Sequence, residues 1–78
     1  MDRLNTRKLS TIAQDIETDW TNVNYAARPY LDAMHTLENI DGNYHYDSAS
    51  SVVLYFLSNA SAWRGDTARR IKKELKAL

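Results

Sequence analysis

The sequence has no cysteine, only two glycines and one proline, and no net charge, because ten basic residues balance ten acidic ones. The absence of cysteine excludes disulfide scaffolds, zinc ribbons, thiol nucleophiles and iron–sulfur sites. Two isolated glycines cannot form a phosphate-binding or dinucleotide-binding loop. A net charge of zero also removes the overall electrostatic signature of a nucleic-acid-binding protein.

Long hydrophobic runs are absent as well. The longest, residues 52–57, is far shorter than the ~20 residues that span a bilayer, and the first residues show no apolar segment of a secretion signal. We therefore expect a cytoplasmic protein with no membrane partner. A chain of 78 residues has room for one modest core, so we expect a single helical domain over residues 1–78. So small a domain offers little room for a catalytic pocket, so we expect no enzymatic activity, cofactor or small-molecule substrate.

Four stretches place apolar residues at helical spacing, which predicts an all-α fold, a small compact bundle of about four helices. The first helix is expected over about residues 6–20, with Thr6 as its N-cap. The second is expected to begin near Tyr25, after a short turn, so that Pro29 falls close to its first turn. A longer helix from Asn22, kinked at the proline, is the alternative.

A cluster of turn-forming residues over 38–47 predicts the main loop. Asp47 is expected to cap a third helix that continues to Trp63. The β-branched stretch over residues 52–55 could form a strand, but no other part of the sequence offers a partner for it. A helix is therefore the better prediction for this stretch.

Arg64 and Gly65 are expected to end the third helix, because glycine commonly follows a helix C-terminus. Asp66 is expected to cap a fourth helix that runs to Leu78, and to pair with Arg70 one turn later. The predicted core of the bundle consists of apolar residues from all four helices: Leu9, Ile12, Ile16, Leu31, Met34, Val53, Phe56, Leu57, Ile71 and Leu75.

Three stretches of the sequence carry a resemblance to other chains: YAARPYLDAM at residues 25–34, VLYFLSNA at 53–60 and WRGDTARRIKKEL at 63–75. Together they resemble short uncharacterised bacterial and phage-borne open reading frames over most of the chain. The resemblance implies a bacterial or mobile-element origin. Because that group has no assigned activity, the resemblance implies no functional residue.

The predicted main loop alternates side chains that could bind a cation: Asp41, Asn43, His45 and Asp47. It lacks the glycine and the glutamate that a calcium loop needs at its sixth and twelfth positions. His35 and His45 also lack neighbours at metal-binding spacing. A turn followed by a helix cap is therefore the expected structure, with no metal site.

The sequence holds more large aromatic residues than one small core is expected to need, which places some of them near the surface. Small helical domains often gain stability from a second copy. We therefore expect a non-enzymatic interaction or regulatory module that acts through a homodimer or another protein partner, with Trp20, Tyr30, Tyr55 and Trp63 as interface anchors. The alternative is a monomer whose tryptophans belong to the core.

Charge is distributed unevenly along the chain. Residues 64–78 hold six basic and two acidic residues, a net charge of +4; the first ten residues carry +2 and the middle −6. This distribution favours a second hypothesis, a nucleic-acid-binding accessory protein in which Thr67, Arg69, Arg70 and Lys73 of the last helix face the nucleic acid. The spacing around them matches a helix-turn-helix only in part, and a solvated helix face is the simpler interpretation.

Overall fold

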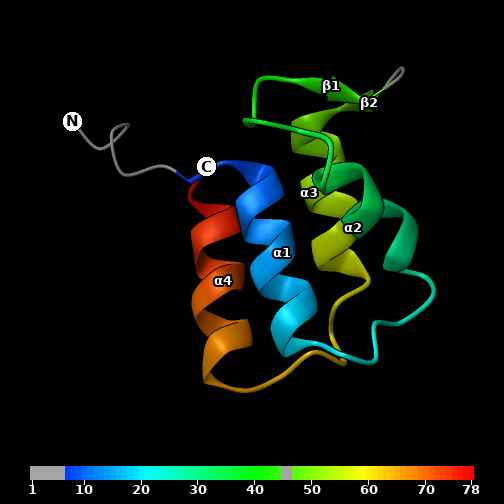
Figure 1. Cartoon of the computed structure of the whole chain (residues 1–78), viewed down its shortest axis with the longest axis vertical. Coiled ribbons are helices and arrows are strands. Elements are labelled where there is room, and N and C mark those ends of the chain that lie inside the picture. Colours follow the sequence, from blue (N-terminus) through cyan, green and yellow to red (C-terminus); the bar gives the residue numbers. More distant parts are fainter. Residues whose placement is uncertain (1–6, 45–46) are drawn as a thin grey trace.

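The computed structural model describes residues 7–44 and 47–78, and this part of the chain folds around one core. Its elements are α1 (Leu9–Asp19), α2 (Arg28–Met34), β1 (Asn43–Tyr44), β2 (Asp47–Ser48), α3 (Ala49–Ser58) and α4 (Asp66–Lys76). The all-α prediction of about four helices is confirmed (Figure 1). The two short strands pair antiparallel within the predicted main loop, a feature that the sequence analysis did not predict.

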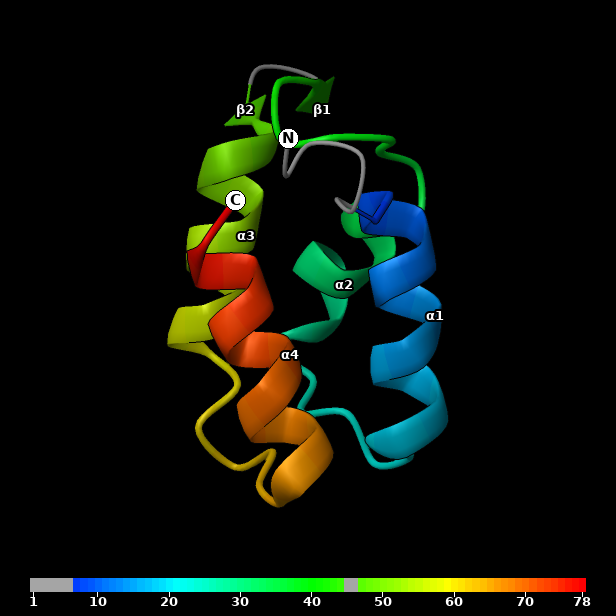
Figure 2. The same cartoon turned by 90° about the vertical axis from the view of Figure 1, so that its left-hand side faces the viewer.

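The helices surround the core so that α1 and α3 lie on opposite sides of the bundle, with α4 in front of the space between them in Figure 2. Helix α2 packs against both α1 and α3, and α4 packs against α1. Every predicted core residue is buried except Leu57, which is partly buried at the edge of the core. The helical spacing of apolar residues therefore identified the interior correctly.

Helix α1 begins without a side-chain cap. The predicted cap, Thr6, lies outside the described residues, and the helix starts at Leu9. The backbone N–H groups of Leu9 and Ser10 donate to the carbonyls of Glu38 and Leu37, at 3.1 and 2.9 Å. The segment after α2 thus satisfies N–H groups that a cap would otherwise satisfy.

Helix α2 starts later than predicted, at Arg28, with Pro29 in its first turn as expected. The preceding residues form a turn in which the Asn24 side chain accepts from the N–H of Ala26 at 3.0 Å. Such local bonding by asparagine competes with helix formation. This hydrogen bond explains why the helix does not begin near Tyr25. It also explains why the alternative, a longer helix from Asn22 with a kink at Pro29, does not form.

Helix α3 is capped by Ser48, not by Asp47 as predicted, because β2 extends through Ser48 and the first helical residue is Ala49. The Ser48 hydroxyl accepts from the N–H of Ser51 at 3.1 Å. The stretch considered as a strand lies inside this helix, as expected. The helix ends at Ser58, however, so the prediction that it continues to Trp63 is wrong.

Gly65 starts α4 rather than ending α3. Its φ of 111° lies in the region that glycine adopts without strain, and Asp66 is the first helical residue instead of the cap. The predicted pair with Arg70 is also replaced, because Asp66 pairs with Arg69, at 3.2 Å. Residues 59–65 therefore form a loop between the last two helices.

Candidate functional site

Three aromatic side chains form a cluster inside the bundle. The rings of Trp20 and Trp63 stack with centroids 5.8 Å apart, and Phe56 meets each of them edge-on at 6.3 Å. The indole N–H of Trp63 donates to Asp19 at 2.8 Å. Trp20 is only 8% exposed and Trp63 only 2%, so neither offers a partner much surface to bury. The core alternative describes these two tryptophans better than the interface-anchor prediction.

Lys72 links the loop between α3 and α4 to the last helix by hydrogen bonds. Its ammonium donates to the carbonyl of Ala60 at 2.8 Å and to that of Trp63 at 2.7 Å, and lies 5.8 Å from the centre of the Trp63 ring. Burial lowers the pKa of Lys72, and the nearby charges of Lys76 and Arg64 lower it further. The side chain thus has a structural role and also lies among like charges.

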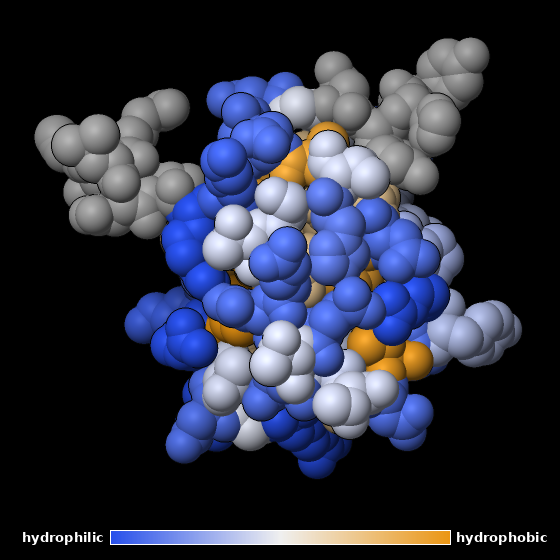
Figure 3. Space-filling view, viewed as in Figure 1, coloured by the Kyte–Doolittle hydropathy of each residue, from blue (hydrophilic) through white to orange (hydrophobic). Residues whose placement is uncertain are grey.

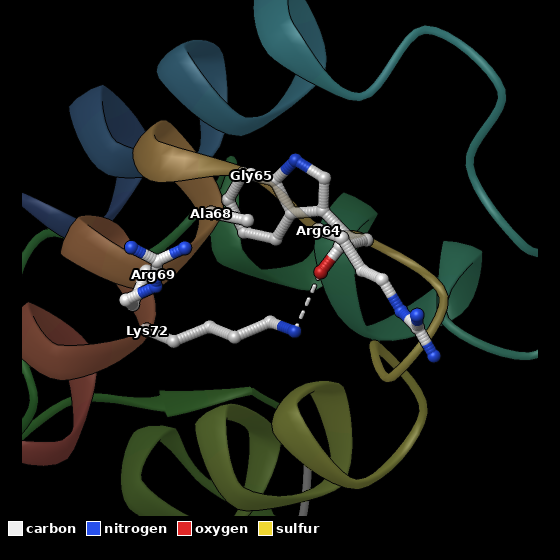
Figure 4. Close-up of a pocket in the computed structure, with 6 residues that line it drawn as sticks. Arg64, Gly65, Ala68, Arg69 and Lys72 are labelled. Carbon is white, nitrogen blue, oxygen red and sulfur yellow. Dashed lines mark hydrogen bonds between the residues drawn. The ribbon is translucent and has the colours of Figure 1, made fainter.

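A shallow hollow of about 290 Å³ lies beside this ammonium, at the start of α4. Figure 4 shows the end of Lys72 between Arg69 and Arg64, whose side chains extend to opposite sides. The hollow is lined by Trp63, Arg64, Gly65, Ala68, Arg69 and Lys72. Three cations and no carboxylate therefore line it.

Further cations continue from the hollow along α4. Helical spacing places Lys73 and Lys76 next to Arg69 and Lys72, on successive turns. We call Arg64, Arg69, Lys72, Lys73 and Lys76 the basic face. Sequence reasoning singled out only two of its members, Arg69 and Lys73, although the helical spacing of the bases was a usable signal.

The other two residues predicted to contact nucleic acid, Thr67 and Arg70, lie outside the basic face. Arg70 is exposed, whereas Thr67 is partly buried. Arg70 lies one turn before Lys73, whereas Thr67 lies six residues before Lys73 and shares its side of α4 with Glu74. The four predicted residues thus lie on one helix but not on one face, because Arg69 lines the hollow, Arg70 adjoins Lys73 and Thr67 lies on another side of the helix.

Three acidic residues on and next to α1, Asp15, Glu17 and Glu74, pair with basic side chains. The Arg7 guanidinium donates to Glu74 at 2.8 and 2.9 Å and also pairs with Asp15. Glu17 pairs with Arg28, and its other oxygen lies 2.8 Å from the His35 ring. The hydrogen bond from Arg28, with a further one from His35, lowers the pKa of Glu17. These contacts tie α1 to α2 and to α4.

The outer side of α3 differs from the charged surface around α1, because no charged residue occurs over residues 48–63. Leu54 is 60% exposed and Tyr55 44%, and the ring of Tyr55 packs on that of Tyr30 from α2 with centroids 5.4 Å apart. We call the set Tyr30, Ser51, Leu54, Tyr55 and Ser58 the uncharged face. On the opposite side of the molecule, over α1, the surface is mostly hydrophilic, with small separate apolar spots (Figure 3).

Within residues 7–44 and 47–78, no three histidine, aspartate or glutamate side chains gather in a way that could hold a metal ion. The cation-loop alternative also involved His45, which lies outside the described residues. No helix in the described part of the chain is long and apolar enough to cross a membrane.

No protein-family model matches the chain, and neither a curated protein nor a solved structure matches it.

Proposed function

We propose that this chain is a small interaction module that pairs with a second copy of itself through the uncharged face. The observation that carries the proposal is the exposure of Leu54 and Tyr55 on a helix without any charge. Depletion of charged residues and enrichment in tyrosine are the compositional marks of interface centres. Exposed leucine and tyrosine also regain buried apolar area when a second surface covers them.

A second copy is the occupant that fits this face best. In a two-fold dimer each surface patch meets its own copy, so any charge on the patch would face a like charge. The uncharged face avoids this repulsion, and the zero net charge of the chain adds none at long range. The ring of Tyr30 packs against the ring of Tyr55. This contact restricts the Tyr55 side chain before binding and so limits the entropy that it loses on binding.

The expected dimer is concentration-dependent. Helix α3 has 10 residues and is therefore about 15 Å long. A contact centred on one such helix buries less than the ~1,600 Å² of a standard stable interface. We therefore expect the dimer to form at high protein concentration and to dissociate on dilution.

Light-scattering mass across a dilution series tests this proposal. The wild type should approach twice the 9.0 kDa of one chain at high concentration and return to one chain on dilution. Leu54→Glu should remain monomeric, because it places two carboxylates face to face across the two-fold axis. Thr11→Glu, which adds the same charge to an exposed position of α1, should still dimerise.

Circular dichroism on each variant checks that the helices are intact. A wild type that stays monomeric up to about 1 mM, the limit of weak binding, would contradict the proposal. So would a Leu54→Glu variant that dimerises like the wild type. The cytoplasmic location stays a prediction.

A further inference from the structure

The basic face differs from the other charged parts of the molecule in how few of its cations have a carboxylate partner. Within the described residues, only Arg69 of this face forms an ion pair, with Asp66. That pair is exposed, and such pairs contribute little. Glu74, the other acidic residue of α4, forms its ion pair with Arg7. The face therefore keeps its positive potential.

Lys72 lies at the centre of this potential. Two of its three N–H groups donate to loop carbonyls, which fixes the ammonium beside the hollow and leaves one donor for another acceptor. Its lowered pKa reflects burial and the repulsion from Lys76 and Arg64. A bound anion would relieve that repulsion, and the fixed ammonium loses little freedom on binding it.

We propose that the basic face binds the phosphodiester backbone of a nucleic acid, with one phosphate in the hollow between Arg69 and Lys72. A row of cations on successive helical turns matches a ligand with repeated negative charges better than a single small anion. The arginine supplies a planar fork of donors for phosphate oxygens, and the lysines supply point charges. This binding surface is separate from the uncharged face.

The observations favour a nucleic acid over a membrane. A helix that binds a lipid surface inserts its apolar side between the headgroups. The apolar side of α4 is buried in the core through Ala68, Ile71 and Leu75, and α4 has no large exposed hydrophobic residue. On a bilayer, the charges of α4 would therefore bind the headgroups without any apolar side chain that could insert between them.

The chemistry of the face also predicts how selective the binding is. Trp63 is buried, so it cannot stack on a base, and the cations contact phosphate rather than base edges. We therefore expect binding that depends little on sequence and strongly on salt. Two of the acidic residues of α1, Asp15 and Glu17, are compensated by Arg7 and Arg28.

Fluorescence anisotropy with a short labelled DNA duplex, and with one of its single strands, tests the proposal. We expect dissociation constants of about 1–100 μM at physiological salt, with affinity falling steeply between about 50 and 200 mM salt. Arg69→Gln with Lys73→Gln should weaken binding and lower the salt slope by about 2, because each lost phosphate contact removes about 0.9. Lys73→Arg keeps the charge and should bind like the wild type.

Lys8→Gln is the matched control for Lys73→Gln. Lys8 is 65% exposed, carries the same charge, and pairs with Glu38, at 3.4 Å, instead of belonging to the row of cations on α4. Its loss should leave the salt slope unchanged, whereas the loss of Lys73 should lower the slope by about 0.9. Circular dichroism confirms that each variant is folded.

Three outcomes would overturn the proposal. These are no binding of either oligonucleotide at about 50 mM salt, equal effects of Lys73→Gln and Lys8→Gln, and binding to phosphatidylserine vesicles or polyglutamate that equals or exceeds binding to DNA. Leu54→Glu should bind DNA with the wild-type salt slope per chain. Failure of the dimer proposal therefore leaves this one standing, and the reverse also holds.

Discussion

Helices α3 and α4 follow each other along the chain and have opposite outer surfaces. Helix α3 has no charged residue and leaves Leu54 and Tyr55 exposed, whereas most residues of α4 are charged and its apolar ones are buried. Both contribute their inner side to the same core. The comparison shows that burial fixes only one side of each helix, so the outer sides can differ completely.

The two helices also begin in different ways. The N-terminus of α3 is capped by a side chain, since the Ser48 hydroxyl accepts a hydrogen bond from a backbone N–H. The N-terminus of α4 has no side-chain cap and instead follows Gly65, which adopts a positive φ. Between them, Trp63 and Lys72 hold the connecting loop against the bundle. The two faces are therefore fixed relative to each other by the contacts of this loop, to which Lys72 of the basic face contributes two of its three donors.

The largest expected effect comes from Trp63→Ala, which removes the link that both helices share. Loss of a buried tryptophan costs about 3–5 kcal/mol, a large part of the stability of so small a domain. Urea unfolding followed by circular dichroism measures the loss. Leu54→Ala removes an exposed side chain and should change stability by less than about 0.5 kcal/mol. A Trp63→Ala variant that keeps wild-type stability but loses dimer mass would assign Trp63 to an interface instead.

The two helix starts give the next largest effect. Gly65→Ala forces a side chain into a positive-φ conformation and should cost about 1–3 kcal/mol, whereas Ser48→Ala removes one cap and should cost about 1 kcal/mol. Gly42→Ala is the control for the glycine, because Gly42 does not have a positive φ and its added Cβ would approach nothing closer than 3.4 Å. Equal unfolding energies for the two glycine variants would contradict the distinction.

Within α4, Lys72 and Lys73 separate structure from charge. Lys72→Met leaves the carbonyls of Ala60 and Trp63 without their donor and should destabilise the fold by about 1–2 kcal/mol. Lys73→Met removes an exposed charge and should change stability by less than about 0.5 kcal/mol. Thermal unfolding of the two variants distinguishes these results. Identical melting temperatures would mean that Lys72 does not hold the loop.

The smallest effect lies outside both helices, at Glu17. Its folded-state pKa is below the usual value of about 4.5, so its ion pair stabilises the fold above that pH, and the contribution is lost as pH falls through the lowered pKa. Glu17→Gln should therefore be slightly less stable than the wild type at neutral pH and equally stable in strong acid. Melting temperature across pH measures this, with Glu38→Gln as the control. A gap that widens in acid would contradict the sign.

Apolar spacing predicted the four helices, and nearly all of the residues assigned to the core are buried. It failed where long-range contacts override local pattern. Ala60 and Trp63 continue the spacing of α3 and are buried, yet they lie in a loop whose carbonyls are bound by Lys72, several residues further along the chain. No local signal in the sequence reveals such a contact. The cap was assigned to Asp47 for a similar reason, since the pairing of β2 with β1 through Ser48 was not visible in the sequence.

The candidate sites were predicted in part. The sequence hypothesis named Arg69 and Lys73 of the basic face but not Lys72 or Lys76, and the contribution of Arg64 and the hollow depend on how the loop over residues 59–65 folds. Among the aromatic residues, composition indicated that some lie near the surface, but two of the four named as interface anchors, Trp20 and Trp63, are buried. Exposure separates Tyr55 from the two tryptophans only once the helices are packed.

The central claim is that the two outer faces act independently, and one crossed experiment tests it. Light-scattering mass at high concentration and DNA anisotropy below the dimer concentration are measured on the wild type, Leu54→Glu, and Arg69→Gln with Lys73→Gln. The account predicts that the first variant loses only dimer mass and the second loses only DNA binding. A variant that remains folded yet loses both properties would contradict it.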